Sequence, residues 1–180
     1  MAISLIKSTL LTSAALLVGC AGTPYSPAPF TPANIDPSAY VAKVDAFVVV
    51  MDTSSSMKYS DEGRSKFYGA KDVVSHMNQT IPEFSYKSAL VGFGSGSCVN
   101  GEKARVVYGP ATHRTADFSN GLDMLECAGG VSPMEKGVYA GGNAVKGSGQ
   151  IALFLVSDFL QINDDAVIAK VDALKADYGD

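Results

Sequence analysis

Residues 46–57 read AFVVVMDTSSSM. The first six residues are apolar and include three valines, a composition typical of a strand that is buried on both faces of a parallel sheet. Asp52 ends this apolar run, and a short polar segment follows it. Ligand sites in open α/β sheets form at the carboxyl ends of strands. We therefore expect a functional site at Asp52.

A second apolar run, IALFLVS at 151–157, also ends at an aspartate, Asp158. Strand and helix patterns alternate between the two runs, which predicts an α/β fold with a doubly wound, mostly parallel sheet and helices on both faces. The turn pair Asn100-Gly101 predicts that the strands flanking it are antiparallel neighbours. The predicted strands are 46–51, 86–93, 104–108 and 151–157, and the predicted helices are 67–81, 120–126, one starting at 132, and 164–178.

The last predicted helix ends two residues before the end of the sequence at Asp180. In a doubly wound sheet, such a helix leads into a further strand. We therefore expect the domain, 42–180, to lack its last strands. The strand at 151–157 would then have an open edge that a longer chain or a partner covers.

The composition predicts one globular domain with a packed core, because 47% of the 180 residues are hydrophobic and 18% are charged. The formal net charge is −4, and lysine and arginine do not cluster anywhere along the chain. This distribution excludes a surface built to neutralise phosphates. Nucleic acid is therefore not expected as a partner.

Residues 1–20 have the pattern of an export signal, with Lys7 followed by an apolar run too short to span a bilayer. The closing residues, LVGC at 17–20, resemble a bacterial lipobox, in which the cysteine is lipidated and becomes the new N-terminus. The resemblance implies that a lipid on Cys20 anchors the protein in the cell envelope. With Ala21 next, it favours the outer membrane, with the domain facing the periplasm or the cell surface.

A proline-rich segment, 21–41, follows the signal and contains five of the chain's eight prolines. Such a composition favours extended polyproline conformations, so we expect a semi-rigid linker between the anchor and the domain.

Two cysteines, Cys98 and Cys127, remain after Cys20 is assigned to the lipid. Disulfides persist outside the cytoplasm, so we expect one bridge between them, worth about 3–4 kcal/mol by loop-closure entropy. The alternatives are a metal pair or two free thiols. A zinc site is disfavoured because no histidine or further cysteine lies nearby to complete it.

The polar segment after the first strand places Asp52, Ser54 and Ser56 at alternate positions. Alternate residues in a turn can direct their oxygens to the same point, and oxygen ligands of low charge suit Mg²⁺ or Mn²⁺. An ion held by two neutral hydroxyls keeps residual positive charge. It would therefore attract an Asp or Glu carboxylate of a protein partner.

The sequence Asp52-Thr-Ser54-Ser-Ser56-Met resembles the metal-ion-dependent adhesion site (MIDAS) of von Willebrand factor type A domains, whose leading motif is Asp-x-Ser-x-Ser. In that family, a threonine from a later loop and an aspartate at the end of the fourth strand complete the site. Ser132 and Asp158 stand at these places in the present chain. The resemblance covers about residues 45–178 and implies a metal-dependent adhesion module.

Two positions depart from the family pattern, because Ser132 replaces the usual threonine and Phe159 stands where bacterial relatives commonly have glycine. The signal and proline-rich segment are also similar to those of lipoproteins in which this domain precedes a peptidoglycan-binding domain like that of outer membrane protein A. No such second domain follows in this sequence.

Three other interpretations compete with a metal site. Asp52 and Ser54 are also typical helix caps, and Ser132 forms a capping box with Glu135. A structural envelope lipoprotein would use the same fold without metal. A HAD-like phosphotransferase would use Asp52 as nucleophile, but position 54 lacks the second acid that such enzymes use. No nucleophile elbow Gly-x-Ser-x-Gly occurs either, so we do not expect an enzyme.

The two histidines are also weak candidates for a catalytic base. We expect His76 to be a solvated helix residue and His113 to lie in a loop without a partner.

Overall fold

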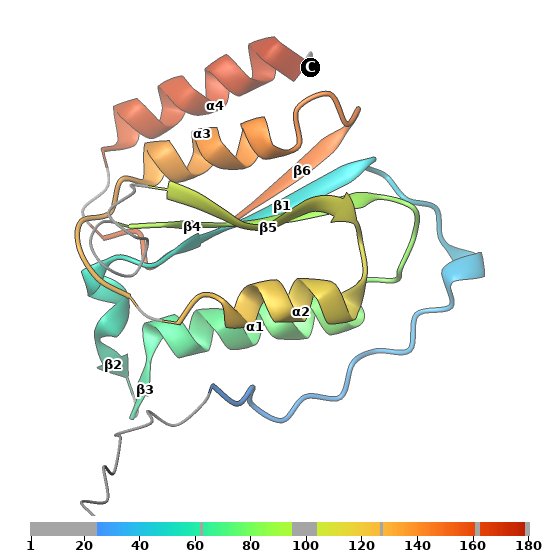
Figure 1. The fold of residues 1–180 in the computed structure, drawn as a ribbon, viewed down its shortest axis with the longest axis horizontal. Coiled ribbons are helices and arrows are strands. Elements are labelled where there is room, and N and C mark those ends of the chain that lie inside the picture. Colours follow the sequence, from blue (N-terminus) through green and yellow to red (C-terminus); the bar gives the residue numbers. More distant parts are fainter. Residues whose placement is uncertain (1–24, 62, 95–103, 127, 161–162, 179–180) are drawn as a thin grey trace, which may run out of the picture.

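The computed structural model describes residues 25–61, 63–94, 104–126, 128–160 and 163–178. Its main sheet has four strands in the order β5-β4-β1-β6 (Figure 1). The two neighbours of β1 are parallel to it, whereas β5 is antiparallel to β4. The strands are β1 (Ala46–Asp52), β4 (Lys87–Phe93), β5 (Ala104–Thr112) and β6 (Ile151–Val156), and a separate small sheet joins β2 (Ser60–Asp61) to β3 (Arg64–Ser65).

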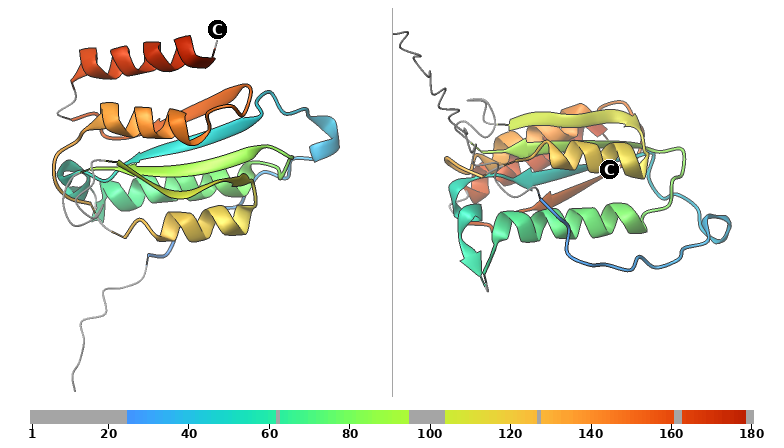
Figure 2. Two further views of the ribbon diagram at one scale, coloured as in Figure 1. Left: turned by 45° about the horizontal axis from the view of Figure 1, so that its top comes forward. Right: turned by 60° about the horizontal axis from the view of Figure 1, so that its bottom comes forward.

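Helices cover both faces of the main sheet (Figures 1 and 2). One face carries α1 (Lys66–Thr80) and α2 (Thr115–Asp123), and the other carries α3 (Met134–Ala144), on which α4 (Asp164–Tyr178) packs. Two short 3-10 helices, η1 (Pro37–Ala39) and η2 (Ser55–Lys58), lie before and after β1. The predicted α/β class and the mostly parallel sheet with helices on both faces are therefore confirmed.

The strand β1 is the centre of the molecule, and all seven of its residues are buried. Because successive side chains of a strand point to opposite faces, its apolar residues divide between two cores. Phe47, Val49 and Met51 face α1 and α2, whereas Val48 and Val50 face α3. This double burial explains why the sequence of β1 is continuously apolar instead of alternating.

Three element boundaries differ from the predictions. The helix expected at 120–126 begins earlier, at Thr115, whose backbone N–H donates to the Glu83 carboxylate at 2.7 Å. The strand expected to end at 108 continues to Thr112. The helix expected to begin at Ser132 begins at Met134, and no side chain caps its N-terminus. The predicted capping box of Ser132 and Glu135 is therefore wrong.

The described part of the predicted linker lies along α1 (Figure 2, right). Tyr25 stacks on Tyr68 with ring centroids 5.8 Å apart, and its hydroxyl donates to Asp72 at 2.9 Å. Farther along α1, Phe30 stacks on His76 with centroids 4.2 Å apart. His76 is therefore covered by this segment, contrary to the prediction of a solvated residue.

Several predictions concern residues that the structure does not describe. The export signal, Cys20, and the expected bridge between Cys98 and Cys127 all lie outside the described ranges. Within those ranges, no helix has the length and apolarity needed to cross a membrane.

Candidate functional site

The five predicted ligand residues lie together at the carboxyl edge of the sheet. Asp52 is the last residue of β1, and Asp158 follows the end of β6 by two positions. Ser54 and Ser56 lie in the turn between β1 and α1, and Ser132 lies in the loop before α3. Parallel β1 and β6 end at the same edge, so segments more than 100 residues apart in sequence meet there.

Backbone hydrogen bonds fix the turn after β1 against the loop before α3. The Ser55 N–H donates to the Gly130 carbonyl at 2.9 Å, and the Gly129 N–H donates to the Thr53 carbonyl at 2.7 Å. The N–H of Thr53 also donates to the carbonyl of Phe93 at the end of β4, at 2.7 Å. These hydrogen bonds between the two loops bring Ser132 close to Asp52. No local sequence pattern predicts them.

Asp52 accepts three hydrogen bonds from neutral donors. Its Oδ1 accepts from the Ser54 N–H at 2.7 Å. Its Oδ2 accepts from the hydroxyl of Ser132 at 3.3 Å and from that of Ser157 at 2.6 Å. The hydroxyl that was predicted to cap α3 is therefore turned to Asp52. Ser157 was missed by the sequence analysis, although it directly precedes Asp158.

The remaining ligand residues continue the network. The Ser54 and Ser56 hydroxyls lie 3.2 Å apart, and the Ser56 hydroxyl donates to Asp158 Oδ1 at 3.1 Å. A continuous chain of hydrogen bonds therefore joins all five predicted residues. The structure therefore brings these five residues together in one hydrogen-bonded network.

Lys66 is a further member of the site that sequence analysis did not find. Its Nζ lies 2.9 Å from Asp158 Oδ2, and the Lys66 side chain is 37% exposed, whereas that of Asp158 is 9% exposed. Burial alone would raise the pKa of Asp158, but hydrogen bonds from Lys66, Leu160 and Ser56 and the charge of Lys66 together lower it. Lys66 is the first residue of α1, and only the fold places it beside Asp158.

Among the described residues, Asp52 has no such counter-charge. It is fully buried, and no ion pair to it occurs among the described residues. A buried carboxylate is costly unless a cation or a metal ion compensates its charge. Neutral hydrogen-bond donors reduce this cost but leave the negative charge in place.

Three oxygen pairs of the cluster have separations that hydrogen-bonded groups and adjacent ligands of a small octahedral cation share. Adjacent ligands of Mg²⁺, each bound at about 2.0–2.1 Å, lie about 3 Å apart. The Ser54–Ser56, Ser56–Asp158 and Ser132–Asp52 oxygen pairs are separated by 3.2, 3.1 and 3.3 Å. No group of three or more His, Cys, Asp or Glu suited to a metal occurs in the described part of the chain, and this cluster has only two carboxylates. An ion held here would be bound mainly by neutral oxygens.

The two histidines lie away from this cluster. His113 is fully buried in the α1–α2 core, where its Nδ1 lies 3.1 Å from the Ser88 hydroxyl and burial lowers its pKa. The prediction that it has no partner is therefore wrong. His76 lies under Phe30 on α1.

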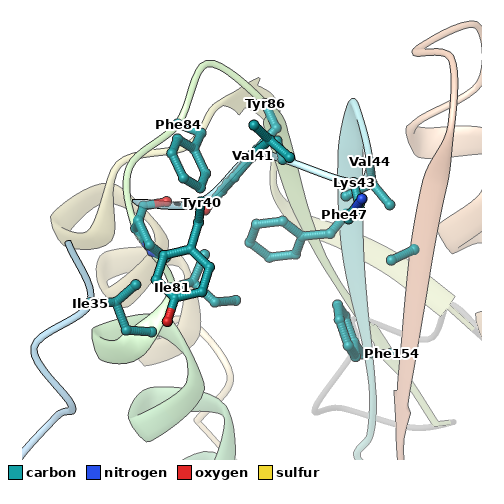
Figure 3. A pocket seen from close by; sticks show the side chains of 13 residues that line it. Ile35, Tyr40, Val41, Lys43, Val44, Phe47, Ile81, Phe84, Tyr86 and Phe154 are labelled. Atoms are coloured by element: carbon teal, nitrogen blue, oxygen red, sulfur yellow. Dashed lines mark hydrogen bonds between the residues drawn. The ribbon is translucent and has the colours of Figure 1, made fainter. Parts of the chain in front are cut away.

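A mostly apolar cavity of about 330 Å³ opens near the start of β1 (Figure 3). Phe47, Tyr86, Phe154 and the segment before β1, including Tyr40 and Val41, line it. It lies toward the amino ends of β1 and β4, whereas the oxygen cluster lies at their carboxyl ends.

No protein-family model matches the chain, and no curated protein matches it. Among the solved structures, a pilus adhesin, SpaC from Lactobacillus rhamnosus GG, is similar with 22% identity and a TM-score of 0.48. The similarity covers 65% of this chain and only 16% of the adhesin. At this level it carries no argument about function.

Proposed function

We propose that the chain is an envelope-anchored, metal-dependent adhesion or assembly module that binds an acidic group of a protein partner, and that it is not an enzyme. The observation that carries the proposal is Asp52, a fully buried carboxylate without a cationic partner among the described residues. Asp52, Ser54, Ser56, Ser132 and Asp158 would hold Mg²⁺ or Mn²⁺. The ion would supply a hard positive centre for a partner's Asp or Glu.

The charge balance favours an acidic partner. Lys66 already pairs with Asp158, so Asp52 is the only uncompensated negative charge of the cluster. A divalent ion next to these groups therefore keeps net positive charge. Hydroxyl ligands neutralise none of it, and an external carboxylate is the complementary ligand.

The resemblance to von Willebrand factor type A domains supports the same proposal, because the residues at all five motif positions meet in one network. The lipobox-like segment supports an envelope location with attachment through Cys20. These assignments predict a module anchored at the outer membrane.

Calorimetric titration with Mg²⁺ and Mn²⁺ tests the proposal on three samples: wild type, Asp52→Asn, and the control Asp117→Ala, which removes an exposed carboxylate on α2. We expect binding heat in wild type and control and none in Asp52→Asn. Without metal, Asp52→Asn should unfold at a temperature equal to or above that of wild type, because it removes a buried charge. Absence of heat in wild type contradicts the proposal.

A metal-free structural lipoprotein is the second candidate. The Lys66–Asp158 ion pair favours it, because an ammonium group already provides one positive charge at the cluster. Under this alternative, neither ion alters the melting temperature of the wild type.

A further inference from the structure

Phe159, beside the ligand Asp158, has an unusual backbone conformation. Its φ is +55°, and no other described residue except glycine has a positive φ. A side chain at this φ crowds the following carbonyl, whereas glycine adopts the conformation freely. The chain therefore carries a bulky residue where glycine would be less strained.

The fold does not offset this strain by burying the ring. Phe159 is 53% exposed and Leu160 is 46% exposed, and neither belongs to the hydrophobic cores. The turn is held by the site itself, because the Phe159 N–H donates to the Ser157 hydroxyl at 2.9 Å. The Leu160 N–H donates to Asp158 Oδ1 at 3.3 Å. Strain that persists without a packing benefit points to a functional role.

Exposed apolar residues also occur on the other loops that carry the site. Tyr59 follows η2 and is 68% exposed, and Val131 precedes Ser132 and is 59% exposed. We name Tyr59, Val131, Phe159 and Leu160 the apolar rim. Each loop that contributes a proposed ligand to the cluster therefore also has an exposed apolar residue within three positions of that ligand in the sequence.

We propose that the apolar rim binds a partner segment in which the metal-bound Asp or Glu is flanked by a bulky apolar residue, and that Phe159 makes the main apolar contact. This inference rests on the proposed function. The bound ion and Lys66 favour the carboxylate, and the rim favours its apolar neighbour. The occupant is therefore an acidic–apolar protein motif, because a purely acidic ligand would leave the rim exposed to water.

Acetate and hexanoate are suitable probes, because they share a carboxylate and differ only in apolar length. Each can be titrated into ¹⁵N-labelled protein with Mg²⁺ present while amide chemical shifts are recorded. We expect wild type to bind hexanoate about tenfold more tightly than acetate, since each buried methylene adds a few-fold in affinity. In Phe159→Gly this ratio should fall close to one.

The control Val73→Ala removes an exposed apolar side chain from α1 and should retain the wild-type ratio. Phe159→Gly should also bind Mg²⁺ with unchanged heat and melt no lower than wild type. If Mg²⁺ and acetate bind but hexanoate gains nothing, or if Phe159→Gly keeps the gain or melts lower, the inference is wrong and the proposed function stands. If Mg²⁺ does not bind to wild type, the proposed function itself fails.

Discussion

Lys66 and Asp52 have opposite effects on a cation at the oxygen cluster. Asp52 is a buried anion without a counter-charge in the described chain, so it attracts a cation. Lys66 lies 2.9 Å from Asp158 and repels one. In the proposed metal site, the affinity would therefore depend on the balance of these two residues, and the hydroxyls would contribute geometry without charge.

Replacing Lys66 by methionine is expected to tighten Mg²⁺ binding about fivefold, equivalent to about 1 kcal/mol, because it removes a partly screened like charge and leaves Asp158 free for the ion. Calorimetric titration measures the change. Lys175→Met, which removes an exposed charge from α4, is the matched control and should not alter the affinity. Weaker binding by Lys66→Met would show that the ammonium group supports the site.

The grouping of the five oxygen-bearing residues could be predicted because Asp52, Ser54 and Ser56 are close in sequence, and because Ser132 and Asp158 match the remaining positions of the motif that the sequence resembles. Lys66 and Ser157 could not be predicted, since each joins the cluster through side-chain partners on separate segments. For Ser132, the sequence left two roles open: N-cap of the following helix or member of the site. In the structure its hydroxyl donates to Asp52 and does not cap α3.

At the scale of elements, the glycines of α3 determine how closely this helix packs on the sheet. Glycine lowers the intrinsic helix propensity, yet its lack of a side chain lets α3 approach the sheet closely. A Cβ on Gly141 would lie 2.5 Å from Val50 Cγ2 in β1. The close approach matters for the site, because α3 follows the loop that carries Ser132.

Gly141→Ala is expected to lower the free energy of unfolding by about 1–3 kcal/mol, because the added methyl group overpacks the contact with a buried, β-branched valine. Chemical denaturation provides the measurement. Gly69→Ala in α1 is the matched control, since none of the neighbouring atoms considered lies within 4 Å of the added Cβ. It should raise the free energy of unfolding by up to about 1 kcal/mol, because alanine has the higher helix propensity. Equal stabilisation by both substitutions would contradict the proposed close packing.

Strands and long helices were well predicted because burial on both faces gives the parallel strands continuous apolar runs and gives the helices a regular apolar period. The start of α2 was missed, since the N–H of its first residue, Thr115, donates to Glu83, 32 residues earlier in the chain. The length of β5 was missed because its residues beyond 108 are largely exposed and follow no apolar pattern. Where the boundary of a helix or strand depends on a residue far away in the sequence, the local sequence has no pattern that predicts it.

At the scale of the whole molecule, Asp72 holds the N-terminal segment on α1. Its carboxylate accepts hydrogen bonds from the Tyr25 hydroxyl at 2.9 Å and the Ala28 N–H at 3.1 Å, and it pairs with Arg64 at 2.8 Å. The side chain of Lys71 lies below, with its Nζ 4.2 Å from the Tyr25 ring centre. The segment therefore covers a buried cation as well as one side of the helix.

Asp72→Ala is expected to release this segment, since two hydrogen bonds from the segment end on this carboxylate, which also holds the Arg64 side chain that donates to the Ser26 carbonyl. Hydrogen exchange at the Ala28 amide should then accelerate toward the rate of an unprotected chain. Asp117→Ala should leave that amide protected. Unchanged protection in Asp72→Ala would mean that the aromatic stacking of Tyr25 and Phe30 alone is sufficient.

The contact of this segment with α1 also limits the distance between the proposed lipid anchor and the oxygen cluster. Arg64 donates to the Ser26 carbonyl at 3.2 Å, so the described chain begins beside the first turn of α1, where Lys66 meets Asp158. Five residues lead from Cys20 to Tyr25, and a fully extended chain of that length reaches about 18 Å. A lipid on Cys20, as proposed, would keep the oxygen cluster near its own bilayer. A binding partner would then have to come close to that bilayer.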